Sequence, residues 1–191
     1  LTSGLARRAQ IQRQLLPVLL EWFGNGTDPD SALLAFRRLS ENLGESHWYL
    51  RMLRDASGAA ERLTYALSTS KLATSLLELI PEGAAWLEDP KLLSPISLEA
   101  LSQESDSIAE RYEYLEDFAK AVRHIRRRET LRLALGWLVG EQTLASISHG
   151  LTHLNDWYLV SLTKEILRQK TPSLDLGIVA MGRFGGSELV F

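Results

Sequence analysis

The sequence predicts a mainly α-helical chain, a multi-helix array that ends in one β-strand and a glycine-rich turn. Apolar residues recur every three or four positions up to Lys170, which is the spacing of one face of a helix. Clusters of proline, glycine and serine interrupt this pattern, as expected at joints between helices. The short apolar run Ile178-Val-Ala-Met181 lies between glycines, which is typical of a buried strand. We therefore expect residues 1–172 to be helical and residues 173–191 to begin an α/β domain.

The composition favours a folded cytoplasmic protein. With 191 residues, of which 45% are hydrophobic, the chain can bury a substantial core. A net charge of −3 argues against a general affinity for nucleic acid or an anionic membrane. The absence of cysteine excludes disulfides, thiolate metal sites and a thiol nucleophile. There is no apolar run of about 18 residues, and the first residues lack the apolar core of a signal peptide, so we expect no membrane partner.

The first helix is predicted from Leu5 to Phe23. Pro17 lies inside its pattern, so either the helix kinks there or two helices meet. The stretch Gly24-Asn-Gly26 then breaks the chain. Asp28 is suited to the N-cap of a new helix and Pro29 to its first position, and this helix is expected to end near Gly44.

Residues 45–89 are predicted to form several short packing helices. Apolar residues supply their buried faces, and the joints between them carry helix-breaking residues. These joints are Ser57-Gly58, Ser68-Thr-Ser70, Ile80-Pro81-Glu-Gly83 and Asp89-Pro90.

A longer helical region is expected to open at Ser94-Pro95 and to extend to Gly140 as one helix. Its exposed face is acidic as far as Asp117 and becomes rich in arginine between Arg123 and Arg132. Such a charge run is usually a solvated surface. The sharper hypothesis is that part of it contacts nucleotide phosphates or the acidic surface of a protein substrate. The candidate residues for this contact are Arg126, Arg128 and Arg132.

The last helix is predicted from Gln142 to Lys170, with a seam of Leu144, Ile147, Leu151, Leu154, Tyr158, Leu162 and Ile166. His149, His153 and Asp156 have a spacing that could place three metal ligands on one face. The glutamate that a zinc-protease motif requires after the first histidine is missing, and Gly150 weakens the helix locally. We interpret these as ordinary histidines and predict no metal site.

The turn Gly182-Arg-Phe-Gly-Gly-Ser187 is the candidate ligand site. A dinucleotide-binding fingerprint would need glycine where Phe184 stands, and a P-loop needs four residues between its glycines and then lysine. What remains is the layout of the phosphate-holding turn in nucleotidyltransferases of the DNA polymerase beta type. There, free backbone amides at the start of a helix bind phosphate oxygens. A glycine-rich strand-to-helix turn without a ligand is the alternative.

The segment from Ile178 to Leu189 resembles the signature of the glutamine synthetase adenylyltransferase family. Val190 and Phe191 depart from the residues usual there. Resemblance extends to Leu34-Ala-Phe-Arg-Arg38, to His47–Asp55 and to the arginine-rich segment from Arg126 to Ala134. Trp137 departs from an acidic residue common in the family. These enzymes attach AMP to a tyrosine of glutamine synthetase and remove it, using two nucleotidyltransferase units.

The resemblance implies a polymerase-beta-like domain that uses ATP and Mg²⁺, with glutamine synthetase and the PII signalling protein as partners. Its implied nucleotide-binding residues are Gly182, Arg183, Gly185, Gly186 and Ser187. The family's metal-binding Ser-Asp-x-Asp is expected just beyond Phe191, so this chain is expected to be inactive alone. Resemblance favours the second, adenylylating half of the enzyme. The alternatives are the adenylyl-removing half, another nucleotidyltransferase such as a uridylyltransferase, and a non-catalytic helical module that binds a protein.

Overall fold

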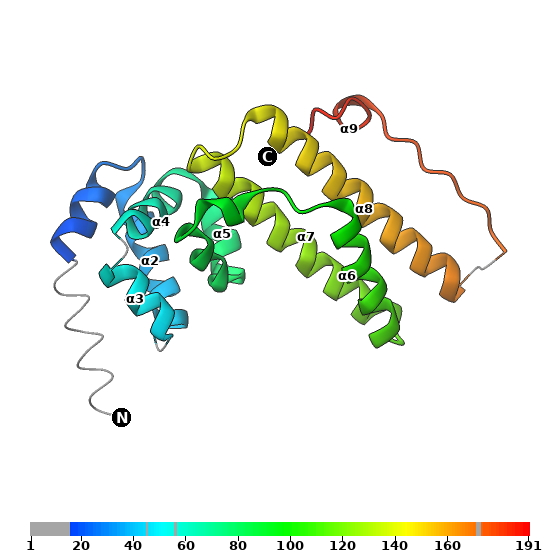
Figure 1. The fold of residues 1–191 in the computed structure, drawn as a ribbon, viewed down its shortest axis with the longest axis horizontal. Helices are drawn as coiled ribbons and strands as arrows, with labels where there is room; N and C mark the ends of the chain where they lie inside the picture. The colour runs from blue at the N-terminus through cyan, green and yellow to red at the C-terminus, as the bar shows by residue number, and fades with distance from the viewer. Residues whose placement is uncertain (1–15, 45, 56, 171–172) are drawn as a thin grey trace. The chain divides into compact units, whose positions relative to one another are not determined.

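The structure is a computed structural model that describes residues 16–44, 46–55, 57–170 and 173–191. Over these residues it is mainly helical and contains no β-strand, so the helical part of the fold prediction is confirmed (Figure 1). The chain divides into two compact units. Unit 1 runs to Leu93 and includes Ala134–Glu141, and unit 2 comprises Ser94–Leu133 and Gln142–Phe191. The expected domain boundary after residue 172 stays a prediction.

Unit 1 is an array of short helices. After a helical segment at residues 16–24 come α2 (Pro29–Leu43), α3 (His47–Asp55), α4 (Ser57–Thr69) and α5 (Lys71–Leu79), then the 3-10 helices η1 (Pro81–Leu87) and η2 (Pro90–Leu93). The start of the helix predicted from Leu5 lies outside the described residues. Helices α2, α3, α4, α5 and η1 pack against one another, and their core contains the fully buried Leu39, Tyr49, Met52, Leu63 and Leu77.

The helix starts in unit 1 follow the predicted capping chemistry. The Asp28 carboxylate accepts a hydrogen bond from the Ser31 amide at 3.2 Å, and Pro29 occupies the first turn of α2. This bond lowers the pKa of Asp28, because it favours the ionised carboxyl. Ser70 caps α5 in the same way through the amide of Ala73. The predicted restart at Asp28 and the joint at Ser70 are thus confirmed.

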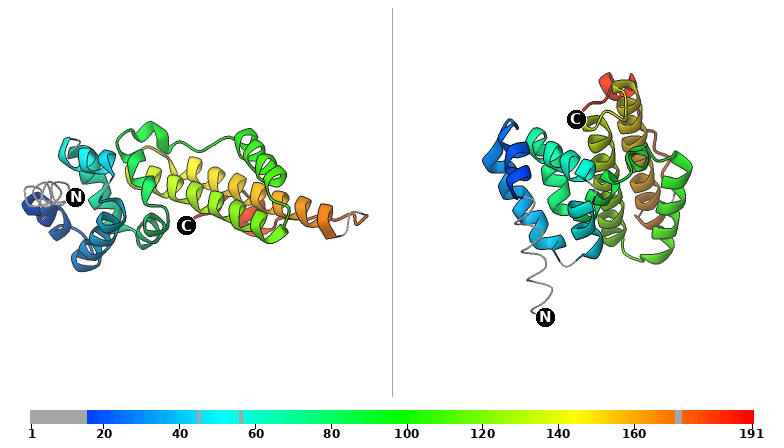
Figure 2. Two further views of the ribbon diagram at one scale, coloured as in Figure 1. Left: turned by 90° about the horizontal axis from the view of Figure 1, so that it is seen from below. Right: turned by 60° about the vertical axis from the view of Figure 1, so that its left-hand side comes forward.

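The long helices of unit 2 are α6 (Leu98–Arg111), most of α7 (Leu115–Leu138) and α8 (Leu144–Lys170). They run side by side in both views of Figure 2. The core between them is apolar and comprises Leu101, Phe118, Val122, Ile125, Leu133, Ile147, Leu151, Leu154 and Trp157. Burial of this face is the main favourable term for the unit.

The predicted single helix from Ser94 to Gly140 is wrong, because the chain forms two helices there. Its first cap is Ser97, whose side chain accepts from the Ala100 amide, and not Ser94. The helix then breaks at Tyr112, which has an extended backbone with φ −105° and ψ 120°. The break lets α6 fold back along α7, so that both helices cover the same core.

Helix α8 begins two residues later than predicted and uses a slightly different seam. Thr143 caps it through the Ser146 amide at 3.2 Å. Ile147, Leu151 and Leu154 are buried as expected, but Leu144 and Ile166 are exposed and Trp157 takes a core position. The seam prediction is therefore right in the middle of the helix and wrong at both ends.

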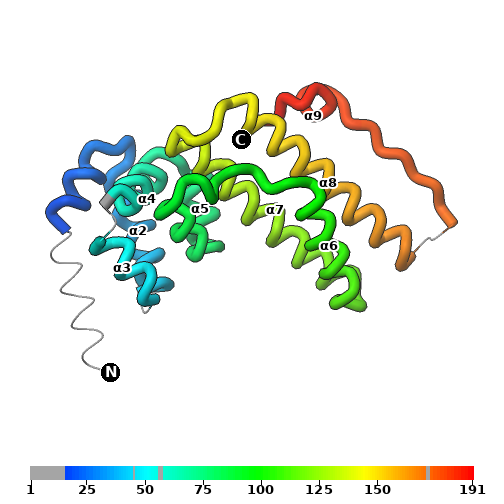
Figure 3. The backbone as a smooth tube through the Cα atoms, in the orientation of Figure 1, coloured from blue at the N-terminus to red at the C-terminus, as the bar shows by residue number. Residues whose placement is uncertain are grey.

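The tail after α8 runs back along that helix and ends near its first half (Figure 3). Residues 174–181 form no strand, and their side chains are exposed, including Val179 at 84% and Met181 at 81%. The predicted buried strand is not seen in this structure, since a strand needs a hydrogen-bonded neighbour and the described residues supply none. A single helical turn, α9 (Gly182–Gly185), follows, and Leu189 packs against the core of unit 2.

Within the described segments, no helix has both the length and the apolar character needed to cross a bilayer.

The joint before α2 generates the first testable prediction. A Cβ on Gly26 would lie 2.5 Å from Ser68 Cβ, and the hydroxyl of the next residue, Thr27, donates to the Ser68 carbonyl at 2.6 Å. Gly26→Ala must therefore push this joint off α4, and we expect a loss of about 1–3 kcal/mol in unfolding free energy. Gly24→Ala is the control, since its Cβ meets nothing within 4 Å. Denaturant unfolding of the purified chain measures both, and equal midpoints would contradict the prediction.

Candidate functional site

The glycine turn folds into one tight helical turn. Gly182 begins it in the left-handed region with φ +59°, which glycine adopts without steric cost. The amides that follow donate back into the turn: Gly185 to the Met181 carbonyl, Gly186 to Gly182 at 2.9 Å, Ser187 to Phe184 and Glu188 to Arg183 at 2.7 Å. The turn is thus stabilised by its own backbone hydrogen bonds.

These bonds correct the expectation that the amides of Gly185 and Gly186 are unpaired and point outward. In this structure both donate to carbonyl oxygens of the turn itself. A phosphate could take them only if the turn opened, because each N–H is a single donor. The side chain of Arg183 is exposed, and Ser187 has a positive φ of 57°. The nucleotide-binding role of Gly182, Arg183, Gly185, Gly186 and Ser187 stays a prediction.

Gly185 has a steric role in the turn that is independent of any ligand. A Cβ at this position would lie 2.6 Å from the carbonyl oxygen of Ala180. A backbone oxygen cannot move aside as a flexible side chain can. Only glycine therefore fits this conformation.

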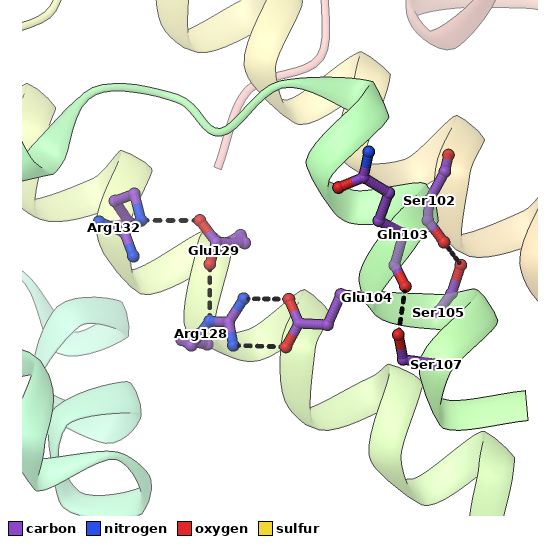
Figure 4. Close-up of polar contacts among 8 residues, drawn as sticks. All are labelled: Ser102, Gln103, Glu104, Ser105, Ser107, Arg128, Glu129 and Arg132. Atoms are coloured by element: carbon purple, nitrogen blue, oxygen red, sulfur yellow. Dashed lines mark hydrogen bonds and ion pairs between the residues drawn. The ribbon is translucent and has the colours of Figure 1, made fainter. Parts of the chain in front are cut away.

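Two members of the arginine cluster are held by carboxylates inside unit 2 (Figure 4). Arg128 binds Glu104 of α6 through both terminal nitrogens, at 2.9 and 2.7 Å, in the fork geometry that suits a carboxylate. Its Nε donates to Glu129 at 2.7 Å, and the Nε of Arg132 donates to the other oxygen of Glu129 at 2.7 Å. We call these four residues the α6–α7 ion network.

Glu129 is the buried centre of this network. Its side chain is only 2% exposed, whereas Arg128 and Arg132 are 25% and 17% exposed. A buried carboxylate is costly unless it is paired, and here each oxygen has its own guanidinium. The hydrogen bonds that Arg128 donates to the Glu104 carboxylate hold the pKa of Arg128 above its usual range, so this residue stays charged.

Arg126 is held differently, by uncharged groups on α8. Its Nε donates to the side-chain oxygen of Asn155 at 3.0 Å, and its guanidinium lies over the ring of Tyr158, 5.1 Å from the centroid. The amide nitrogen of Asn155 is itself bound to the Leu151 carbonyl at 2.7 Å. The neighbouring Arg123 and Arg127 are exposed.

The structure therefore divides the three predicted arginines into two groups. Arg128 and Arg132 belong to the ion network, whereas Arg126 does not. Sequence reasoning missed the acidic partners Glu104 and Glu129. A signal for Glu129 was present: it follows Val122 and Ile125 at core spacing, which places it on the buried face of α7.

A pocket of about 360 Å³ lies beside the ion network in unit 2. Glu129, His149 and His153 line it, and the two imidazole rings are 6.4 Å apart between centroids. Asp156 lines a different groove, with α6. The part of the chain that the structure describes contains no group of three histidine or carboxylate side chains placed to hold a metal ion.

A sequence model of the glutamate–ammonia ligase adenylyltransferase family matches residues 60–191, which is more than half of the chain. The chain belongs to this family. A member from Leifsonia xyli subsp. xyli, a bifunctional glutamine synthetase adenylyltransferase/adenylyl-removing enzyme, is 50% identical over the whole chain. Relatives with the same name from Cutibacterium acnes and Streptomyces coelicolor are each 39% identical, over 100% and 99% of the chain.

This member of the adenylyltransferase family spans about a fifth of the length of the curated relatives it matches, 19% of the Leifsonia and Cutibacterium proteins and 21% of the Streptomyces protein. The family match covers α7, α8 and the glycine turn together. The resemblance noted from the sequence is thus confirmed at the level of the family.

The ion network generates the second prediction. Glu129→Gln removes the charge that both guanidiniums share, and we expect the unfolding free energy of unit 2 to fall by on the order of 3 kcal/mol. Glu110→Gln is the matched control, since this carboxylate is exposed on α6 and such changes usually cost less than about 0.5 kcal/mol. Denaturant titration followed by helical circular dichroism measures both. If the two variants unfold at the same denaturant concentration, the network does not hold the unit together.

Proposed function

We propose that the natural protein containing this chain transfers AMP from ATP to a tyrosine of glutamine synthetase and so regulates nitrogen assimilation. The observation that carries the proposal is the 50% identity, over the whole chain, with a bifunctional glutamine synthetase adenylyltransferase/adenylyl-removing enzyme. Identity of this extent covers the helices of both units and the glycine turn, so it does not depend on one short motif. We place the reaction in the cytoplasm, where ATP and a metabolic enzyme meet.

In this proposal the helices precede a polymerase-beta-like nucleotidyltransferase domain, which begins at residues 173–191. Residues 178–181 would be its first strand. Their exposed apolar side chains support this role, because a sheet would bury them. The metal-binding carboxylates are expected downstream of Phe191, as in the family signature.

The proposed chemistry is in-line attack of a tyrosine hydroxyl on the α-phosphorus of ATP, with pyrophosphate as the leaving group. Catalysis of such a step is mostly positioning and neutralisation of phosphate charge, here by Mg²⁺ and backbone amides. Gly182, Gly185, Gly186 and Ser187 would hold the leaving phosphates, and Arg183 would add a cationic contact. The turn must open for this, because two of these glycine amides are internally bonded.

We assign the chain to the adenylylating half, because the segment from Leu34 to Asp55 resembles the lead-in to the family's second catalytic unit. The adenylyl-removing half is the alternative, since the relatives' names include both activities. The PII signalling protein is a proposed regulator by family resemblance.

The activity prediction uses the natural full-length protein. Incubated with glutamine synthetase, Mg²⁺ and ATP labelled at the α-phosphate, it should transfer label to the synthetase, and chelation of Mg²⁺ should abolish the transfer. A glutamine synthetase whose target tyrosine is replaced by phenylalanine is the control. Without label on wild-type synthetase the proposal fails. Phosphate-dependent release of label would show whether the same half also removes AMP.

The role of the turn is tested by Arg183→Ala in the full-length protein. Loss of one charge-assisted phosphate contact should raise the KM for ATP about tenfold and leave the KM for glutamine synthetase unchanged. Lys91→Ala removes a cation of similar exposure in η2 and should change neither. An unchanged KM for ATP in the Arg183 variant would remove this residue from the nucleotide site.

A further inference from the structure

The three arginines of α7 that the ion network leaves unused lie together on one face of the helix. Arg123, Arg126 and Arg127 have the spacing i, i+3 and i+4, which places their side chains within one helix face. Among the described residues, no carboxylate forms an ion pair with any of the three: Glu104 and Glu129 pair with Arg128 and Arg132, and Asp106 pairs with Lys164. We call these three residues the arginine face.

Arg126 is the fixed member of this face. Asn155 accepts from its Nε, the Leu151 carbonyl orients Asn155, and the ring of Tyr158 lies under the guanidinium. All of these groups are uncharged, so they fix the position of the cation without neutralising it. Within the part of the chain that the structure describes, its two terminal nitrogens have no hydrogen-bond partner, and such a pair of parallel donors can bind a carboxylate or phosphate with two hydrogen bonds. An arginine ordered before binding loses less entropy when it binds.

We propose that the arginine face is the docking surface for an acidic segment of the protein substrate, with Arg126 as its anchor. Because it names a contact surface for glutamine synthetase, the proposal rests on the function proposed above. Three uncompensated positive charges stand out on a chain with a net charge of −3. Carboxylates on a folded protein match this arrangement.

The composition of the face favours a protein over a nucleic acid. All three members are arginine, the residue enriched at protein interfaces, where lysine is depleted. A nucleic-acid surface would extend further and give the domain a basic balance, whereas this chain is acidic overall. The ring of Tyr158 is covered by Arg126 and so offers no free face for stacking a base.

The test compares variants of the full-length protein. Arg123→Ala combined with Arg126→Ala should raise the KM for glutamine synthetase about tenfold while kcat and the KM for ATP stay unchanged. Added salt should raise the KM for glutamine synthetase more in the wild type than in the double variant, since exposed charge pairs are screened. Lys71→Ala combined with Lys91→Ala is the control, because it removes the same charge from exposed positions elsewhere.

Two further variants separate the fixed geometry from charge alone. Asn155→Asp places a carboxylate against the guanidinium of Arg126 and leaves the arginine in place. Tyr158→Leu removes the ring that supports this guanidinium. Both should raise the KM for glutamine synthetase several-fold, whereas a surface that acts by net charge alone would barely respond to Tyr158→Leu. Helical circular dichroism checks that each variant is folded. Arg126→Lys keeps the positive charge but loses the two parallel donors of the guanidinium. Its affinity for glutamine synthetase should lie between those of the wild type and Arg126→Ala.

Binding of fluorescent poly-L-glutamate to each variant is measured in parallel, at the salt concentration of the kinetic assay. This measurement does not require the protein to be active. It should weaken about tenfold in the double arginine variant and not in the lysine control. An active wild type with unchanged KM and polyglutamate binding in the arginine variants overturns the docking surface but not the proposed function. An inactive wild type overturns the proposed function, and with it glutamine synthetase as the occupant; arginine-dependent polyglutamate binding would then show a surface for acidic segments of another protein. A rise in the KM for ATP, or arginine-dependent binding of duplex DNA instead of polyglutamate, would also overturn the proposal.

Discussion

The pairing of buried Glu129 with two guanidiniums is the constraint on which unit 2 depends. A carboxylate that is 2% exposed must be paired, and its partners lie on its own helix at positions 128 and 132. Arg128 then extends the pairing to Glu104 and so fixes α6 against α7. Packing of apolar side chains supplies most of the stabilisation. The ion network adds specificity, since it is satisfied only when the two helices lie in one relative position.

The sequence predicted the helices where strong local signals exist. Asp28-Pro29 and Ser70 mark helix starts by hydrogen bonds within one turn, and the structure contains those bonds. The break at Tyr112 was missed because no proline or glycine stands there. The chain leaves the helix at this tyrosine and α6 packs on α8, which is a tertiary effect. Residues 178–181 were predicted as a strand from their apolar, β-branched composition, but a strand also requires a hydrogen-bonded neighbour.

The candidate site was predictable as a set of residues but not as a set of contacts. The run from Arg123 to Arg132 was visible as charge, whereas its division into paired and unpaired members depends on Glu104, which is 24 residues away from Arg128. Likewise, the spacing Gly182-Arg-Phe-Gly-Gly indicated a tight turn correctly. It could not show that the amides of the turn donate to carbonyl oxygens of the same turn. That depends on the backbone dihedral angles, which a glycine-rich sequence leaves open.

The close approach of Gly185 to the Ala180 carbonyl changes how sequences of relatives should be interpreted. Any chain that folds this turn in the same way must keep glycine there, whether or not a nucleotide ever binds. Glycine at this one position in a distant homologue is therefore a marker of shape and not of activity. A homologue that had lost catalysis could retain this glycine unchanged, so inactive relatives have to be recognised from residues whose identity the shape of the turn does not require.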